Sequence, residues 1–138
     1  MNFEQFNLDS RLMVGIKKAG YETATPIQEA AIPAALRGRD IIGTAMTGTG
    51  KTAAFVLPML QRLQTHKRGN IRALVISPTR ELAEQTNESI ASLGRRTGIH
   101  GISLYGGVGM SQQVRNLRDG VDVAVACPGR LLDHIWQG

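Results

Sequence analysis

The sequence predicts an α/β fold in which helices cover both faces of a parallel sheet. Short runs rich in valine and isoleucine alternate with segments that carry apolar residues at helical spacing. These short runs do not alternate with polar residues, which is typical of strands buried on both faces. The 16 glycines fall mostly between the runs and indicate tight turns. Because ligands bind at the carboxyl ends of strands in such sheets, a site is expected in the loops that follow the strands.

Before the first strand, two helices are expected. Apolar residues recur at helical spacing over residues 12–16, and Gly20 ends this first helix. Thr25 and Pro26 are a typical N-cap and first helical residue, and the helix they open ends near Leu36.

The rest of the chain predicts four steps of strand followed by helix. Strands are expected at residues 40–44, 72–77, 99–105 and 121–126. Helices are expected at residues 51–64, 82–93, 110–117 and from 131 onward. Pro58 lacks a backbone N–H, so we expect the helix at 51–64 to bend there.

Composition limits the classes of protein that remain. The 138 residues, 42% of them hydrophobic, suffice for one domain. The lone Cys127 excludes a disulfide framework and a cysteine-based zinc site, and fits a reducing compartment. No apolar run reaches the roughly 18–20 residues of a membrane span, and no signal peptide is recognisable at the start. A cytoplasmic location without a membrane partner is expected.

The net charge of +5 suits a polyanionic partner, although an aromatic content of 4% disfavours a base-stacking platform. Basic clusters at 66–68, 95–96 and Arg115/Arg118 fall at the predicted C-terminal ends of helices. Cations there favour the negative end of the helix dipole, so we interpret these clusters as solvated surface rather than as a nucleic-acid patch.

The loop after the first strand carries the clearest chemical motif. Residues 45–52, Ala-Met-Thr-Gly-Thr-Gly-Lys-Thr, fit the P-loop pattern with alanine as the first residue. Gly48 and Gly50 let successive N–H groups point at phosphate oxygens, and the helix that follows adds its positive N-terminus. Lys51 can reach the β and γ phosphates, and the Thr52 hydroxyl can ligate Mg²⁺. The nucleotide-binding residues expected here are Thr47, Gly48, Thr49, Gly50, Lys51 and Thr52, with Lys51 and Thr52 also catalytic and Thr52 the metal ligand.

A phosphate loop does not by itself identify the base or the reaction. Nothing in the chain resembles the Asn-Lys-x-Asp guanine reader, which disfavours a GTPase. A small-molecule kinase remains possible on this loop alone.

Four further motifs accompany the loop. They are Gly-Tyr-Glu-Thr-Ala-Thr-Pro-Ile-Gln at 20–28, Pro-Thr-Arg-Glu-Leu-Ala at 78–83, Gly-Gly at 106–107 and Cys-Pro-Gly-Arg at 127–130. In order and spacing the chain resembles the DEAD-box RNA helicases, in which these segments are the Q motif and motifs Ia, GG and Ib, and 45–52 is motif I. The resemblance implies a RecA-like P-loop NTPase fold. It places residues 1–138 in the N-terminal part of the first RecA-like domain, ending before the Asp-Glu-Ala-Asp strand.

The resemblance also implies an adenine site. Gln28 would read the edge of the base, Tyr21 would pack on the base, and Thr23 belongs to the same motif. From the residues alone Gln28 has a second interpretation, because Thr25 and Gln28 have the spacing of a capping box. A Q motif and residues 78–83 both disfavour a DNA helicase or a kinase on this loop.

RNA contacts are implied at three of the motifs. The positions are Pro78, Thr79, Arg80, Gly106, Gly107, Pro128, Gly129 and Arg130. Helix N-termini, glycines and arginines bind phosphates without reading sequence, so single-stranded or duplex RNA would be bound through its backbone. The structural alternatives are an N-cap for Thr79, a turn for the two glycines and an ion pair with Glu81 for Arg130.

Three residues depart from the family pattern: alanine replaces a common proline at 24, methionine a common glutamine at 46 and cysteine the usual threonine at 127. A thiol is a weak hydrogen-bonding group, so one phosphate contact at Cys127 is in doubt. The substitutions at 24 and 46 are expected to have small effects.

The activity implied is ATP- and Mg²⁺-dependent, RNA-stimulated hydrolysis coupled to RNA duplex unwinding, with a second RecA-like domain as partner. The 138 residues contain neither the Asp-Glu-Ala-Asp motif nor the Ser-Ala-Thr motif. The chain alone is therefore expected to bind nucleotide and RNA without turnover. The alternative is a non-catalytic ATP- or RNA-binding module.

Overall fold

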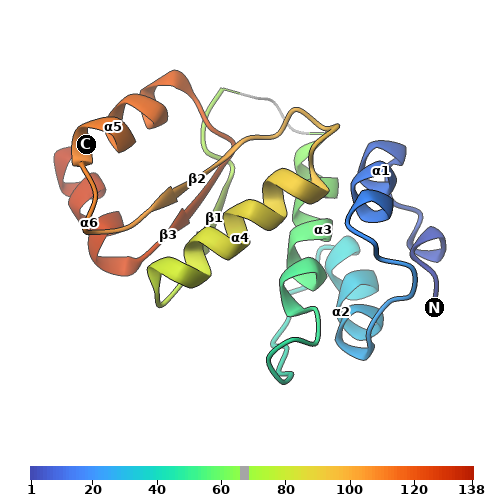
Figure 1. Cartoon of the computed structure of the whole chain (residues 1–138). Coiled ribbons are helices and arrows are strands. Elements are labelled where there is room, and N and C mark those ends of the chain that lie inside the picture. The colour runs from blue at the N-terminus through green and yellow to red at the C-terminus, as the bar shows by residue number, and fades with distance from the viewer. Residues whose placement is uncertain (66–68) are drawn as a thin grey trace. The chain divides into compact units, whose positions relative to one another are not determined.

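The computed structural model describes residues 1–65 and 69–138, and the chain divides into two compact units (Figure 1). The first unit comprises residues 1–65 with Ser92–Gly98, and the second comprises residues 69–91 with Ile99–Gly138. The predicted basic cluster at 66–68 lies outside the described residues. Among the helices of the described ranges, none is both long enough and apolar enough to cross a membrane.

The first unit is helical. Its elements are the short 3₁₀ helix η1 (Phe3–Phe6) and the helices α1 (Ser10–Lys18), α2 (Pro26–Leu36) and α3 (Lys51–Leu63). The predicted start of α2 at Pro26, after Thr25, is confirmed, and α2 packs along α3. The helix α3 runs as a single element through Pro58. The short helix η1 was not predicted; it buries Phe3 and Phe6, whose rings meet edge to face at 5.7 Å.

The prediction of a strand at residues 40–44 is wrong. These residues form no strand, and within the described ranges they pair with none. The side chain of Ile42 is 99% exposed. A short strand persists only where a neighbouring strand takes up its backbone hydrogen bonds, and an apolar run does not by itself provide that neighbour. Three of the four predicted strands are therefore present.

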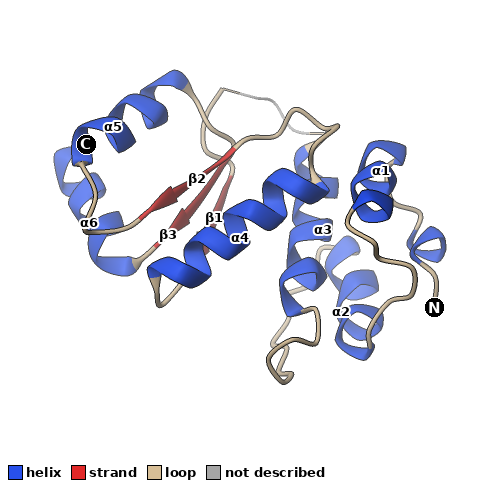
Figure 2. Cartoon of the chain, in the orientation of Figure 1, coloured by secondary structure: helices blue, strands red, loops and turns tan. Residues whose placement is uncertain are grey.

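The second unit is built on a parallel sheet (Figure 2). Its elements are β1 (Ala73–Ile76), α4 (Arg80–Leu93), β2 (Gly101–Leu104), α5 (Met110–Asp119), β3 (Val123–Ala126) and α6 (Pro128–Gln137), except that the last two residues of α4 belong to the first unit. The strand order is β1-β3-β2, so the last strand lies between the other two. All three strands point the same way, and their carboxyl ends meet at one edge of the sheet.

Different helices cover the two faces of this sheet. On one face, residues of β2 and β3 pack against Leu117 of α5 and Leu131 of α6; the strand residues are Ile102, Leu104, Ala124 and Ala126. On the other face α4 lies so close that a Cβ on Gly101 would stand 2.5 Å from Asn87 Oδ1. The predicted helical cover of both faces is confirmed for β2 and β3. The edge strand β1 is less covered, with Leu74 and Ile76 each 52% exposed.

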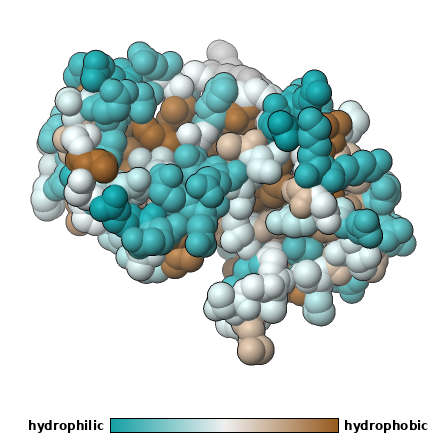
Figure 3. All heavy atoms as spheres, viewed as in Figure 1, coloured by the Kyte–Doolittle hydropathy of each residue, from teal (hydrophilic) through white to brown (hydrophobic). Residues whose placement is uncertain are grey.

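The outward side of α4 is polar. Its exposed residues include Arg80, Glu81, Gln85 and Glu88, and hydrophilic side chains dominate this helix in Figure 3. Arg95 and Arg96 follow the end of α4 and are exposed, as predicted for solvated surface.

A charged cluster that was not predicted ties the amino ends of the strands together. Asp122, buried just before β3, accepts a bond from Arg72 Nη2 at 2.7 Å. Its other oxygen accepts a bond from the backbone N–H of His100 at 2.9 Å. A buried carboxylate is tolerated when both oxygens are satisfied in this way. This cluster stabilises the edge of the sheet opposite the predicted RNA motifs.

Candidate nucleotide and RNA sites

The phosphate loop of the first unit has the backbone that the sequence predicts for phosphate binding. Gly48 and Gly50 have φ values of 82° and 83°, in the left-handed region that favours glycine. Gly50 is the N-cap of α3, which begins at Lys51. The Nζ of Lys51 donates to the carbonyl oxygen of Ala45, so the lysine spans the loop from its end to its beginning. The ammonium group is thus held at the mouth of the loop.

The loop residues fit a nucleotide phosphate. The first N–H groups of any helix lack partners within the helix, and those of α3 follow directly on the two glycines. A Cβ on Gly48 would meet no atom within 4 Å, so space remains on that side of the loop. The described residues contain no group of three or more His, Cys, Asp or Glu suited to a metal. The assignment of Thr52 as a metal ligand stays a prediction.

The Gln28 side chain caps α2 and also bonds the phosphate loop in this structure. Its side chain is 3% exposed, and its Oε1 accepts from the backbone N–H of Thr25 at 3.0 Å. This bond confirms the capping interpretation of the Thr25–Gln28 spacing. The Nε2 donates to the carbonyl oxygen of Gly50 at 3.1 Å, which ties α2 to the phosphate loop. A glutamine amide has a second lone pair and a second N–H, so adenine reading by Gln28 stays a prediction.

The other predicted adenine residues lie apart from the loop in the contacts described. Tyr21 is partly exposed and stacks on Phe3, with ring centroids 6.0 Å apart. The two rings line a pocket of about 260 Å³ whose lining includes neither Gln28 nor a loop residue. Thr23 is exposed and its backbone bridges to Asn2.

In the second unit the three predicted RNA motifs meet at the carboxyl edge of the sheet. Residues 78–80 follow β1, 106–107 follow β2 and 128–130 follow β3. Thr79 Oγ1 accepts from the N–H of Leu82 at 3.2 Å, so the N-cap interpretation of Thr79 is confirmed. The parallel topology brings together segments that are 50 residues apart in sequence.

Two arginines approach the glycine pair at this edge. A Cβ on Gly107 would stand 3.0 Å from Arg80 Nη1, and a Cβ on Gly106 would stand 3.9 Å from Arg130 Nη2. Gly107 has a φ of 84°, so the predicted turn is present and requires glycine. The guanidinium of Arg80 also lies over the ring of Tyr105, with Cζ 4.9 Å from the centroid. We call Arg80, Gly106, Gly107 and Arg130 the arginine–glycine edge.

Arg130 pairs with a carboxylate on its own helix. Its Nε lies 3.8 Å from Asp133 Oδ2, so its ion pair is with Asp133 and not with Glu81. Its Nη1 donates to the carbonyl oxygen of Val108 at 3.4 Å. Together these two partners orient the guanidinium towards the loop after β2.

Cys127 occupies the N-cap of α6 without capping it. Its backbone is extended, and the side chain makes no cap bond. The backbone N–H donates to the carbonyl oxygen of Leu104 at 2.8 Å, which anchors the turn to β2. The predicted loss of a phosphate contact at Cys127 concerns bound RNA and stays a prediction.

Sequence reasoning missed three residues that support this edge: Tyr105, Gln113 and His134. Gln113, 6% exposed on α5, donates from Nε2 to the carbonyl oxygen of Tyr105 at 3.1 Å. Its Oε1 lies 2.9 Å from His134 Nε2 of α6. Because the Gln113 oxygen can only accept, His134 Nε2 must carry the proton. The only sequence signal was the position of Tyr105 next to the glycine pair, since a glutamine on a helix predicts an exposed side chain.

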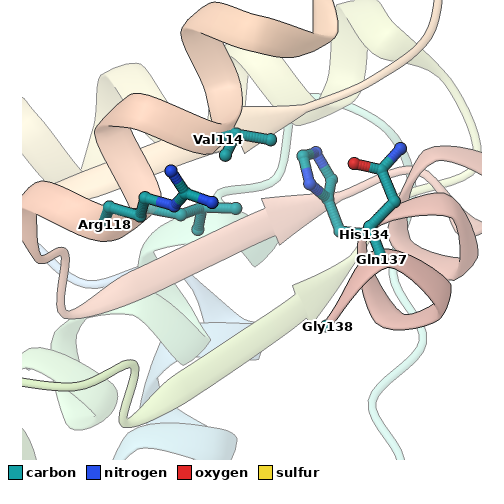
Figure 4. Close-up of a pocket in the computed structure, with 6 residues that line it drawn as sticks. Val114, Arg118, His134, Gln137 and Gly138 are labelled. Carbon is teal, nitrogen blue, oxygen red and sulfur yellow. The ribbon is translucent and has the colours of Figure 1, made fainter.

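His134 lies in a partly enclosed setting. It lines a pocket of about 250 Å³ between α5 and α6, together with Val114, Arg118 and Gln137 (Figure 4). Burial lowers the pKa of His134 below its usual value, and the nearby charge of Arg130 lowers it further, while Asp133 acts in the opposite direction.

Comparison with known proteins identifies the family. The sequence model of the DEAD/DEAH box helicase family matches residues 25–138. The chain belongs to this family. It is 50% identical over 135 residues to the DEAD-box ATP-dependent RNA helicase CshA of Streptococcus pneumoniae (strain TIGR4), covering 98% of the chain and 26% of that protein. It is 46% identical over 133 residues to the ATP-dependent RNA helicase CshA of Listeria monocytogenes, covering 96% of the chain and 25% of that protein.

Solved structures of this helicase family share the fold. The RNA helicase Prp28 from Chaetomium thermophilum, bound to ADP, matches 99% of the chain with a TM-score of 0.88 and 41% identity, over 34% of its own chain. A DEAD box protein from Methanococcus jannaschii matches the whole chain with a TM-score of 0.92 and 36% identity, over 38% of its own chain. The predicted RecA-like α/β class is confirmed. The chain spans about a quarter of the length of the curated helicases it matches.

Proposed function

We propose that this helicase-family chain binds ATP at residues 45–52 and the RNA backbone at the arginine–glycine edge. In this proposal residues 1–138 form the N-terminal part of the first RecA-like domain of a DEAD-box RNA helicase. The single observation that supports it most is the loop that combines two left-handed glycines, a helix N-terminus and a spanning lysine. The names of its relatives, ATP-dependent RNA helicases, agree with this proposal.

At the nucleotide site each residue has a definite task. Backbone N–H groups at Thr47–Gly50 and the first turn of α3 receive phosphate oxygens. Lys51, which donates to the Ala45 carbonyl in this structure, would hold the β and γ phosphates through its ammonium group, and the Thr52 hydroxyl would help to hold the metal. When bound, Mg²⁺ neutralises phosphate charge. Gln28, with Tyr21 and Thr23, would select adenine.

At the RNA site the groups are suited to phosphates and not to base edges. Arg80 and Arg130 supply cationic forks, and the glycines leave the backbone open to close approach. The helix N-termini after Thr79 and Cys127, with Pro78, Pro128 and Gly129 beside them, complete the surface. Binding is therefore proposed to be independent of RNA sequence.

The whole helicase would couple RNA-stimulated ATP hydrolysis to duplex unwinding, with a second RecA-like domain closing on the first. A polypeptide of these 138 residues is proposed to bind without turnover, because no motif in the printed sequence supplies a carboxylate for the attacking water. The cytoplasmic location stays an expectation.

Equilibrium titration with a fluorescent ATP analogue tests the nucleotide site. Lys51→Ala should abolish measurable binding, because the loop loses its cation for the β and γ phosphates. Lys18→Ala, which removes an exposed lysine at the end of α1, is the matched control and should bind normally. Wild-type affinity in Lys51→Ala would refute the site.

Competition by GTP, CTP and UTP tests the role of Gln28. A site that bonds the edge of one base rejects the others because buried groups are left unpaired. ATP should therefore compete best against the labelled analogue. Equal competition by ATP and GTP would leave Gln28 with its capping role alone.

Salt titration of RNA binding tests the arginine–glycine edge. Arg80→Ala and Arg130→Ala should each weaken binding of single-stranded RNA. Each should also reduce the slope of log K against log salt by about 0.7 for every phosphate that the variant no longer neutralises. Arg95→Ala removes an exposed arginine interpreted as solvated surface and should change neither quantity. An unchanged slope in both edge variants would place RNA elsewhere.

A further inference from the structure

We propose that Tyr105 is a positioning residue that holds the guanidinium of Arg80 in the orientation in which it meets an RNA phosphate. The proposal rests on the RNA-binding function proposed above and assigns a role to a residue that none of the motifs includes. Its basis is the cation–π contact between Arg80 and Tyr105 at the arginine–glycine edge.

Arg80 needs such support because it is exposed at the first residue of α4. An exposed arginine has many rotamers, and freezing them when a ligand binds lowers the affinity. The Tyr105 ring, with its centroid 4.9 Å from Cζ, and the Gly107 backbone beside Nη1 restrict those rotamers in advance. No carboxylate in the described part of the chain forms an ion pair with Arg80, so no such pair would have to break before its guanidinium bonds a phosphate.

Tyr105 is itself held firmly enough to act as a support. It directly follows β2 and is half-buried. Its carbonyl oxygen accepts from Gln113 Nε2 at 3.1 Å, and the same Gln113 amide is bonded to His134 at 2.9 Å. The position of the tyrosine backbone is therefore supported by β2 and by Gln113 of α5, which is itself bonded to His134 of α6.

The competing role for an aromatic residue at an RNA surface is stacking on a base. In this structure the ring is already in contact with a cation, which favours support of Arg80. An RNA-stacking role makes a different prediction, because the ring would then contribute to binding even without Arg80. The two roles are separable by combining substitutions.

The first experiment needs no RNA. In ¹⁵N NMR spectra of the free protein, the Nε–Hε signal of Arg80, assigned with Arg80→Lys, should show slower motion and a ring-current shift in wild type. Tyr105→Leu should abolish both, and Tyr105→Phe, which keeps the ring, should retain both. An Arg80 signal that is the same in wild type and Tyr105→Leu would overturn the proposal.

The second experiment is a double-mutant cycle on RNA affinity. Tyr105→Leu should weaken binding of a single-stranded RNA by about two- to fivefold, the range expected for an exposed cation–π contact, and Tyr105→Phe should bind as wild type. In the Arg80→Ala background, Tyr105→Leu should have no further effect. The same reduction in affinity in both backgrounds would overturn the positioning role in favour of direct stacking or a structural role.

The two experiments distinguish a failure of this positioning role from a failure of the proposed RNA-binding function. If the wild-type protein bound no RNA, the proposed function would fail, and the phosphate-positioning role would fail with it. If RNA bound and Arg80→Ala weakened it, but Tyr105→Leu changed neither the NMR signal nor the affinity, only the positioning role would fail.

Discussion

The Nε2 of Gln28 donates to the carbonyl oxygen of Gly50 across 3.1 Å, so the first turn of α2 and the phosphate loop share one buried side chain. The same amide caps α2 through the N–H of Thr25. Gly50 is thus restricted twice, by a φ of 83° and by a neighbour that leaves no room for a Cβ. A change at either residue is expected to affect both helix and loop.

Gly50→Ala should damage the loop more than Gly48→Ala, although both glycines have the same left-handed backbone. Each substitution costs about 1–2 kcal/mol of stability for the left-handed alanine. At Gly50 the new Cβ would also stand 2.4 Å from Gln28 Nε2, which adds about 1–3 kcal/mol of overpacking. Gly50→Ala should therefore lower the free energy of unfolding in urea, and the affinity for ATP, more than Gly48→Ala does. Equal losses of stability in the two variants would show that the contact with Gln28 adds no cost at Gly50.

Gly15→Ala should destabilise the first unit although it raises helix propensity. In an exposed helix, glycine to alanine normally stabilises by about 0.5–1 kcal/mol. A Cβ on Gly15 would stand 2.1 Å from the carbonyl oxygen of Leu93, which is backbone and cannot rotate away. We expect a net loss of about 1–3 kcal/mol in urea unfolding. A gain in stability would mean that α1 and residue 93 separate freely in solution.

Local signals were sufficient for most of the fold. The start of α2 follows from two adjacent residues, Thr25 and Pro26, whose preferences act within one turn. The strands β1, β2 and β3 each lie inside a predicted apolar run. Residues 40–44 have the same kind of composition, but a strand also requires a distant partner. No local pattern states whether that partner is present.

In the candidate sites too, features set by neighbouring residues could be predicted, and features that depend on distant segments could not. The phosphate loop could be predicted because its glycines, lysine and helix start are contiguous in sequence. The support of Arg80 by Tyr105, and of Tyr105 by Gln113, depends on segments that meet only through the order β1-β3-β2. A polar residue such as Gln113 is buried only because two specific partners satisfy it, and its own sequence neighbourhood carries no sign of them.

Cys127→Thr should stabilise the second unit. Residue 127 already has the extended backbone of an N-cap, and a threonine hydroxyl there can accept a bond from the first turn of α6. A gain of about 0.5–1 kcal/mol in urea unfolding is expected. Cys127→Val, which has the same shape as threonine without the hydroxyl, is the matched control and should show no gain.

The same variant bears on RNA. If the hydroxyl at position 127 also reaches a phosphate, Cys127→Thr should strengthen RNA binding, by about 0.5–1.5 kcal/mol for one neutral hydrogen bond, and leave nucleotide affinity unchanged. An RNA affinity equal to that of Cys127→Val would assign this contact to backbone N–H groups alone.

The lowered pKa of His134 predicts that the protein loses stability in mildly acidic solution. Burial and the charge of Arg130 hold the folded-state pKa below the ordinary value of 6.5, so the unfolded chain binds a proton more readily than the folded one between those two values. The stabilisation is therefore complete above pH 6.5 and is lost as the pH falls through the lowered pKa of the folded state. His134→Gln cannot take up this proton, and its amide can still donate to Gln113 Oε1. Thermal unfolding at about pH 7.5 and about pH 5.0 should thus show a smaller acid-induced loss of stability in His134→Gln than in wild type. An equal loss in both proteins would mean that other groups carry the whole pH dependence in this range.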